Sequence, residues 1–95
     1  MIYSLTFLES AKKEWDKLSP PLKLQFKKKL KQRLSNPYVK KDKLSGMPAY
    51  KIKLRQSGYR LVYKVFDDRI VVQVVSVGKR DKNLVYDMAQ SRLHY

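Results

Sequence analysis

The stretch that decides the fold is Tyr50-Lys51-Ile52-Lys53-Leu54-Arg55-Gln56-Ser57-Gly58-Tyr59-Arg60, in which apolar and cationic residues alternate. Alternation with a period of two is typical of a strand with one dry face and one wet face. The apolar members are predicted to face the core, so Lys51, Lys53 and Arg55 form a row of cations roughly 7 Å apart. The chain can turn at Ser57-Gly58 and return as a second strand. A rigid sheet that displays fixed cations suits a polyanion such as RNA or DNA.

The composition of the chain points to the same kind of partner. Its 95 residues include 22 Lys and Arg against 8 Asp and Glu, which gives a formal charge of +14 and a pI near 10.1. This excess predicts salt-dependent binding to nucleic acid or another polyphosphate; a surface that merely keeps the protein soluble does not need it. The length fits one domain, residues 1–95. Cysteine is absent, which excludes disulfides and suits the cytosol.

The remaining segments predict an α+β domain in the order β-α-α-β-β-β-α. Helical spacing of apolar residues indicates helices over 9–18 and 20–36, the second with Ser19 as N-cap and a stripe of Leu22, Phe26, Leu30 and Leu34. Strands are predicted at 2–7, 50–55, 59–66 and 69–77, with a tight turn at Asp67-Asp68. A last helix over 82–93 carries the stripe Leu84/Val85, Met88/Ala89 and Leu93. We therefore expect a largely antiparallel four-stranded sheet with an N-terminal helical hairpin and a C-terminal helix.

The usual catalytic groups are missing from this sequence. Its one histidine, His94, is expected to be an exposed tail residue, and the acidic residues form no recognisable metal motif, with Asp81 better explained as a helix N-cap. There is no phosphate-binding glycine loop. We expect no metal and no cofactor. What remains is a set of cations and one tyrosine: Lys51, Lys53, Arg55, Arg60, Lys64, Lys79, Arg80 and Tyr86. Periodicity alone favours a half-buried surface aromatic for Tyr86. For Arg80, a solvated charge at a strand end and a functional charge are equally compatible with the sequence.

Several segments resemble the RelE family of the RelE/ParE toxin superfamily. They are residues 43–48 (Lys-Leu-x-Gly-Met-Pro), 50–63 (the basic strand continued by Gly-Tyr-Arg-Leu-Val-Tyr), 75–80 (Val-Ser-Val-Gly-Lys-Arg), and the basic helical segments 12–18 and 27–30. The resemblance covers nearly the whole chain and implies a RelE-like microbial RNase fold. It implies the catalytic set Lys51, Lys53, Arg60, Arg80 and Tyr86, a combination typical of the RNA-cleaving branch. It also implies RNA or ribosome contacts by Arg55, Lys64, Lys79, Lys28 and Lys29. Ser45 departs from relatives that have a basic residue there.

The resemblance further implies a function. It is that of a type II toxin, a metal-independent and ribosome-dependent endoribonuclease that cuts mRNA in the A site by 2′-hydroxyl attack. Either Lys53 or Tyr86 would be the general base. The implied partners are the ribosome and its rRNA, the message, a RelB-like antitoxin, and operator DNA only through the antitoxin complex. We expect a cytoplasmic protein with no membrane contact. Two alternatives stay open, a ParE-like gyrase inhibitor and a nucleic-acid-binding module without catalysis.

Overall fold

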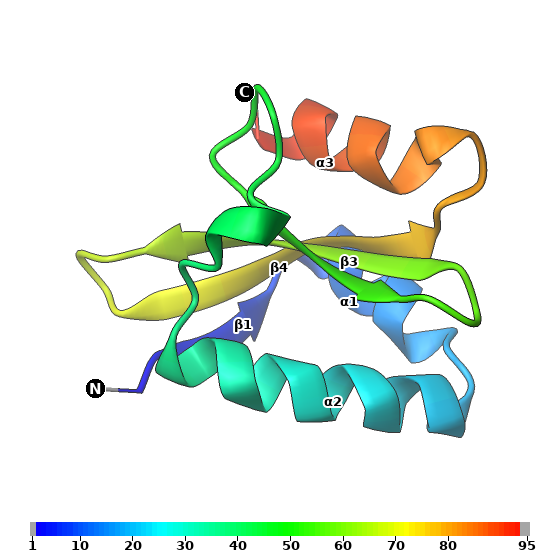
Figure 1. Ribbon diagram of the computed structural model, residues 1–95, viewed down its shortest axis with the longest axis horizontal. Coiled ribbons are helices and arrows are strands. Elements are labelled where there is room, and N and C mark those ends of the chain that lie inside the picture. Colours follow the sequence, from blue (N-terminus) through cyan, green and yellow to red (C-terminus); the bar gives the residue numbers. More distant parts are fainter. Residues whose placement is uncertain (1, 94–95) are drawn as a thin grey trace.

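A four-stranded mixed sheet between two layers of helices forms the framework of the protein (Figure 1). This computed structural model describes residues 2–93, with the side chains of all of these except Lys82. The elements follow the predicted order: β1 (Ser4–Phe7), α1 (Glu9–Asp16), α2 (Pro20–Ser35), η1 (Lys40–Asp42), β2 (Tyr50–Leu54), β3 (Tyr59–Phe66), β4 (Val71–Lys79), η2 (Asp81–Asn83) and α3 (Leu84–Leu93). The predicted fold class is confirmed, with η1 and η2 as short 3₁₀ turns that the sequence did not reveal. His94 lies outside the described residues.

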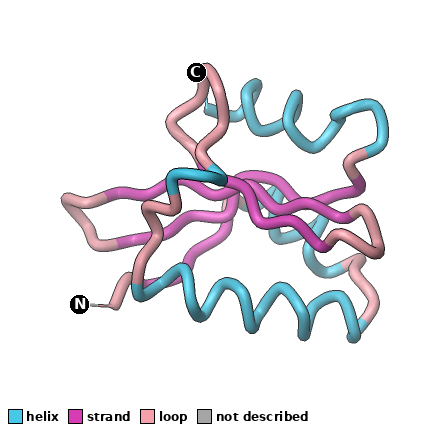
Figure 2. The backbone as a smooth tube through the Cα atoms, viewed as in Figure 1, coloured by secondary structure: helices cyan, strands magenta, loops and turns pink. Residues whose placement is uncertain are grey.

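The strands lie in the order β1-β4-β3-β2. β3 is antiparallel to β2 and to β4, whereas β1 runs parallel to β4. Figure 2 shows the sheet between α2 on one face and α3 on the other. Because β4 is central, it needs apolar residues on both faces, as its valine-rich sequence predicted: Val72 and Val74 join the core under α1 and α2, and Val75 joins the core under α3.

The larger core lies between the sheet and the helical hairpin of α1 and α2. The predicted α2 stripe is confirmed, because Phe26 and Leu30 are fully buried and Leu22 and Leu34 pack against them. The ring centroids of Trp15 on α1 and Phe26 on α2 are 6.2 Å apart. The sheet contributes the apolar side of the basic strand to this core, so the cations of that strand must point away from it.

The smaller core lies under α3. Val85 and Ala89 are buried against β3 and β4, but Leu84 and Met88 are 57% and 41% exposed. The prediction of a wide apolar stripe on this helix was therefore half wrong. Successive residues on a helix are separated by about 100° of rotation. When Val85 and Ala89 face the sheet, Leu84 and Met88 therefore point away from it, toward solvent.

Two local predictions near β4 were wrong. The turn between β3 and β4 spans four residues, Asp67 to Ile70, rather than Asp67-Asp68 alone. A two-residue turn of this kind prefers glycine or asparagine, because it needs positive φ angles. Asp81 is not an N-cap, since Arg80 before it already has helical angles (φ −64°, ψ −17°). Ser19 does occupy the N-cap position of α2, without a hydrogen bond from its side chain.

A clamp of two charged residues, Glu14 of α1 and Arg92 of α3, joins the two helical layers. The guanidinium donates to both carboxylate oxygens, at 2.9 and 3.0 Å, and to the carbonyl of Val75 at 2.7 Å. Glu14 also accepts from the N–H of Val77, where β4 continues past the end of β1. Both side chains are mostly buried, so the clamp fixes α3 against β4 and α1.

None of the helices in residues 2–93 is long and apolar enough to span a membrane.

Candidate functional site

The strand register gathers three predicted site residues on the face of the sheet that α3 partly covers. Lys51 pairs with Val62, a member of the core under α3, and Lys53 pairs with Arg60. Side chains opposite each other on paired strands share one face and stand roughly 5 Å apart at Cβ. Like charges placed in this way destabilise a sheet. The Lys53–Arg60 pair is therefore costly to the fold, and that cost is explained if a bound anion relieves it.

Arg60 is buried although it is a cation. It is only 6% exposed, its Nη1 donates to the carbonyl of Tyr59 at 3.0 Å, and its Nε has no hydrogen-bond partner. No ion pair within residues 2–93 includes it. A buried charge without a counter-ion is unfavourable unless a ligand supplies one. The buried guanidinium with its unpartnered Nε is thus a candidate binding group for an anion.

Arg80 and Tyr86 come to the same region from β4 and α3. Arg80 directly follows β4, and its backbone N–H donates to the carbonyl of Gly58 at 2.8 Å, which holds the end of β4 beside the β2–β3 turn. The Arg80 side chain is exposed. Tyr86 is half-buried against the core under α3, as its periodicity predicted. Of the predicted catalytic set, Lys51 and Lys53 lie on β2, Arg60 lies on β3, Arg80 follows β4 and Tyr86 lies on α3. The register places the first three of them on one face of the sheet.

The charges around Lys53 alter its protonation. Its pKa is lowered from the ordinary value for lysine, chiefly by the positive charge of Lys51, then by desolvation, and further by Arg55 and Arg60. The carboxylate of Asp42 acts in the opposite direction. A lysine with a lowered pKa is neutral more often at a given pH, and only a neutral amine can accept a proton.

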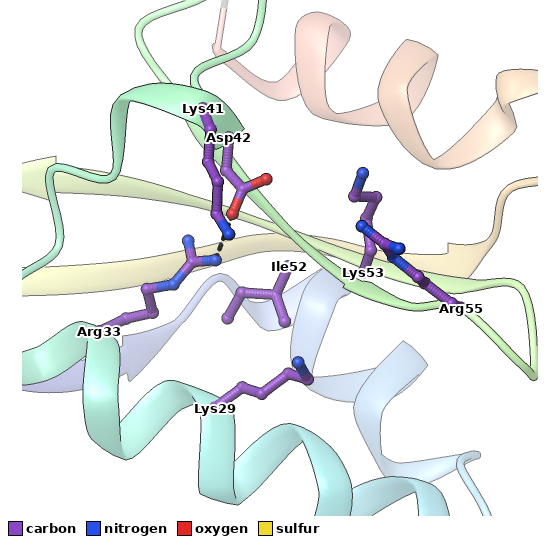
Figure 3. A pocket seen from close by; sticks show the side chains of 7 residues that line it. All are labelled: Lys29, Arg33, Lys41, Asp42, Ile52, Lys53 and Arg55. Carbon is purple, nitrogen blue, oxygen red and sulfur yellow. Dashed lines mark hydrogen bonds and ion pairs between the residues drawn. The ribbon is translucent and has the colours of Figure 1, made fainter.

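A cavity of about 210 Å³ lies at the edge of the sheet on the side of α2, between α2, η1 and the outer edge of β2 (Figure 3). Its lining residues are Lys29, Arg33, Lys41, Asp42, Ile52, Lys53 and Arg55. Two residues of the predicted RNA-contact set, Lys29 and Arg55, thus line one cavity together with Lys53. The others lie apart from it: Lys28 is exposed on α2, Lys64 lies 4.8 Å from the Phe66 ring centroid, and Lys79 lies 5.8 Å from that of Tyr59.

An ion pair between Arg33 and Asp42 forms one wall of the cavity, and sequence reasoning missed it. Both side chains are mostly buried. Arg33 also donates to the carbonyl of Lys51 at 3.2 Å and to the hydroxyl of Tyr63 at 3.0 Å, so it connects α2 to the backbone of the basic strand. One signal was available: Asp42 is the only acidic residue between positions 17 and 66. A lone carboxylate among so many cations indicates a specific partner.

In residues 2–93 there is no group of three or more histidine, cysteine, aspartate or glutamate side chains that could hold a metal ion.

Comparison with known proteins places this arrangement in a family. A model of the family described as the ParE toxin of the type II toxin–antitoxin system parDE matches residues 5–84. The mRNA interferase toxin RelE of Escherichia coli K12 is 53% identical over 94 residues, which cover 98% of this chain and 99% of that protein. The mRNA interferase RelE of Shigella flexneri shows the same identity and coverage.

Solved structures agree with these relatives. A free double arginine-to-alanine mutant of E. coli toxin RelE superposes with a TM-score of 0.91 at 52% identity, over 98% of this chain and 99% of that one. The toxin in the intact E. coli RelBE toxin–antitoxin complex gives 0.79 at 56% identity, over 81% of this chain and 95% of that one. With a full-length relative at this level of identity and a family model that matches most of its residues, the chain belongs to the RelE toxins within the ParE toxin family of type II toxin–antitoxin systems.

Proposed function

We propose that this protein is the toxin of a type II toxin–antitoxin system and cleaves mRNA in the ribosomal A site. The observation that carries the proposal is the Lys53–Arg60 pair on β2 and β3, in which the guanidinium is buried with its Nε unpartnered. Such a pair suits a phosphate that gains negative charge during a reaction. The mRNA interferase activity named for the RelE relatives gives that phosphate a source.

The reaction begins at a 2′-hydroxyl of the message. Its oxygen attacks the adjacent 3′-phosphate, a new O2′–P bond forms and the P–O5′ bond breaks, which leaves a 2′,3′-cyclic phosphate and a 5′-hydroxyl. One proton leaves the 2′-hydroxyl and another reaches the 5′-oxygen. Arg60 and Arg80 bind the phosphate oxygens and stabilise the extra charge of the pentacoordinate state. These cations supply this stabilisation from side chains, so the reaction as proposed is metal-independent.

Lys53 is the general base in this proposal. Lys51 stands two residues away on the same strand face and lowers the pKa of Lys53, which favours the neutral amine that can take the 2′-hydroxyl proton. Tyr86 reaches the site from α3, where its ring can stack on a base of the message and its hydroxyl can exchange a proton with the leaving group. In-line attack needs a strained RNA geometry, which the ribosome would help to impose; alignment can contribute about 7–11 kcal/mol.

The proposed partners follow from this activity. They are the programmed ribosome with its rRNA, the message in the A site and a cognate RelB-like antitoxin, and operator DNA is reached only through the antitoxin complex. The E. coli relative forms such a complex with RelB. The formal charge of +14 suits both rRNA and an acidic antitoxin segment. We propose the cytoplasm as the place of action, because translating ribosomes are there.

Primer extension on a translated message tests the function. We expect the purified protein to produce new 5′ ends within codons of the translated message, and no such ends when the ribosomes are left out. A gyrase supercoiling assay with the same protein is the control for the ParE-like alternative. Inhibited supercoiling together with an intact message would contradict the proposal. Binding of the message without cleavage would instead support the non-catalytic alternative.

A substitution beside Lys53 tests the general base. In Lys51→Met the largest cause of the lowered pKa is removed, so the pKa of Lys53 rises and its neutral form becomes rarer at neutral pH. The single-turnover cleavage rate should then fall at neutral pH, and its difference from the wild type should shrink as the pH is raised. The matched control is Lys31→Met, which removes an exposed charge that is not among the causes of the Lys53 shift. A rate lowered equally at every pH would count against Lys53 as the base.

A further inference from the structure

The cavity between α2, η1 and β2 holds more positive charge than its wall can neutralise. Arg33 and Asp42 pair with each other. The other charged lining residues are Lys29, Lys41, Lys53 and Arg55. None of these four takes part in an ion pair within the described residues. Apart from Lys53, which is the base in the proposed function, the hollow is lined by Lys29 of α2, Lys41 of η1 and Arg55 after β2. Three cationic side chains from different parts of the fold around one hollow attract an anion.

The size and lining of the cavity define the kind of anion. A volume of about 210 Å³ is several times the roughly 30 Å³ that one water molecule occupies in the liquid. A phosphate group with a few waters therefore fits. Ile52 is the one apolar residue in the lining, so the cavity offers little surface to a nucleobase. Lysine and arginine side chains are the usual ligands of phosphate oxygens.

Lys53 connects this cavity to the proposed reaction site. It lines the cavity and also stands opposite Arg60 in the β2–β3 register. In Figure 3 the heads of Lys53 and Arg55 lie beside each other at the edge of β2, with Lys29 rising from α2 and Lys41 reaching in from η1. A phosphate in the cavity and a reacting phosphate at the Lys53–Arg60 pair would therefore lie on either side of Lys53. In a single RNA strand, the phosphate in the cavity is then that of an adjacent nucleotide.

We propose that this cavity binds a backbone phosphate of the message that is adjacent to the phosphate that reacts. The proposal rests on the proposed function and extends it to a second contact with the same RNA strand. Lys29 and Lys41 are positioning residues in this view. They hold the strand so that the 2′-hydroxyl, the reacting phosphate and the leaving oxygen come into line, and they do not touch the reacting atoms.

Matched lysine variants test the cavity. The test variant is Lys29→Ala/Lys41→Ala and the control is Lys31→Ala/Lys40→Ala, which removes two lysines from the same helix and the same 3₁₀ turn. Lys31 lines a different, apolar groove beside β1, and Lys40 does not line the cavity. All four side chains are exposed, so both variants should unfold at the same urea concentration as the wild type.

The readout is single-turnover cleavage on programmed ribosomes as a function of protein concentration. We expect the concentration for half-maximal rate to rise about tenfold in the cavity variant, as for the loss of one hydrogen-bonded contact to a charged group. It should change less than about twofold in the control, since exposed charges contribute little. Equal weakening in both variants would overturn the proposal, because only the total charge would then matter.

A chemically altered message identifies the phosphate. One neutral methylphosphonate is placed at the linkage on either side of the scissile phosphate, in separate messages. At one of the two positions the methylphosphonate should raise the concentration for half-maximal rate of the wild type. It should not raise that of the cavity variant any further, because the two changes remove the same contact. Effects that add at both positions would overturn the proposal and assign the cavity to an rRNA phosphate or an acidic protein segment. If the wild type cleaves no message at all, the proposed function itself has failed.

Discussion

Replacing Arg60 or Arg80 by alanine should lower the single-turnover rate of message cleavage on the ribosome by about 10²–10³, the usual cost of one charge-stabilising group. Arg60 is expected to act from a buried position, where its unpartnered Nε gains a hydrogen bond when the phosphate becomes more negative. Arg80 acts from the end of β4, next to the β2–β3 turn. Because both guanidiniums stabilise charge in the transition state, the maximal rate should fall more than the apparent affinity.

Arg69→Ala is the matched control for these two variants. It removes the same charge from the exposed β3–β4 turn, where the Arg69 guanidinium lies 3.7 Å from the Asp68 carboxylate and 4.3 Å from the ring centroid of Phe66. Its cleavage rate should stay within a few-fold of the wild type. Arg60→Met is a second variant at this position that keeps most of the buried side-chain volume. A loss of rate in this variant cannot be caused by an empty space left under α3. Cleavage by Arg60→Met and Arg80→Ala at the rate of Arg69→Ala would contradict the proposed site.

Replacing Arg33 by methionine should lower the free energy of unfolding by about 3–5 kcal/mol, because it leaves the carboxylate of a mostly buried Asp42 without its partner. The same change removes the donors to the Lys51 carbonyl and the Tyr63 hydroxyl, so the edge strand β2 loses its connection to α2. Urea unfolding followed by circular dichroism measures the effect. Domains of this size have only about 5–15 kcal/mol in total, so the loss is a large fraction of the stability.

Two further variants show whether charge is the cause. Lys31→Met removes an exposed charge from the same helix and should change the free energy of unfolding by less than about 0.5 kcal/mol. Arg33→Met/Asp42→Asn removes both charges and should regain much of the lost stability, since the buried carboxylate is gone. If the double variant is no more stable than Arg33→Met, packing rather than the unpaired charge explains the loss.

The sequence predicted the strands better than it predicted the burial of individual charges. Alternation in residues 50–55 was enough to predict the first basic strand and the faces of its side chains, because that pattern depends only on neighbours along the chain. The sequence also placed Arg60 at the start of the second strand, without indicating whether it is buried. The structure buries it, because residues far along the chain lie over that face, and no local pattern reports such coverage. The Arg33–Asp42 pair was missed for a related reason, since the partner geometry depends on how α2 approaches β2.

The clamp between Glu14 and Arg92 has a consequence for the order in which the site assembles. The two residues are 78 positions apart, whereas β2 and β3 are joined by a four-residue turn. Closing a long loop costs more entropy and generally comes later in folding than forming a hairpin. Elements that close late are also candidates for opening first by local unfolding. Release of the clamp would leave α3 held only by the small core of Val85 and Ala89 and by the hydrogen bond from Ser76 to the Val85 carbonyl. The helix, with Tyr86, would then open more readily than the hairpin of β2 and β3. In the proposed site, such a state would keep the cations of β2 and β3 in place and would lose Tyr86.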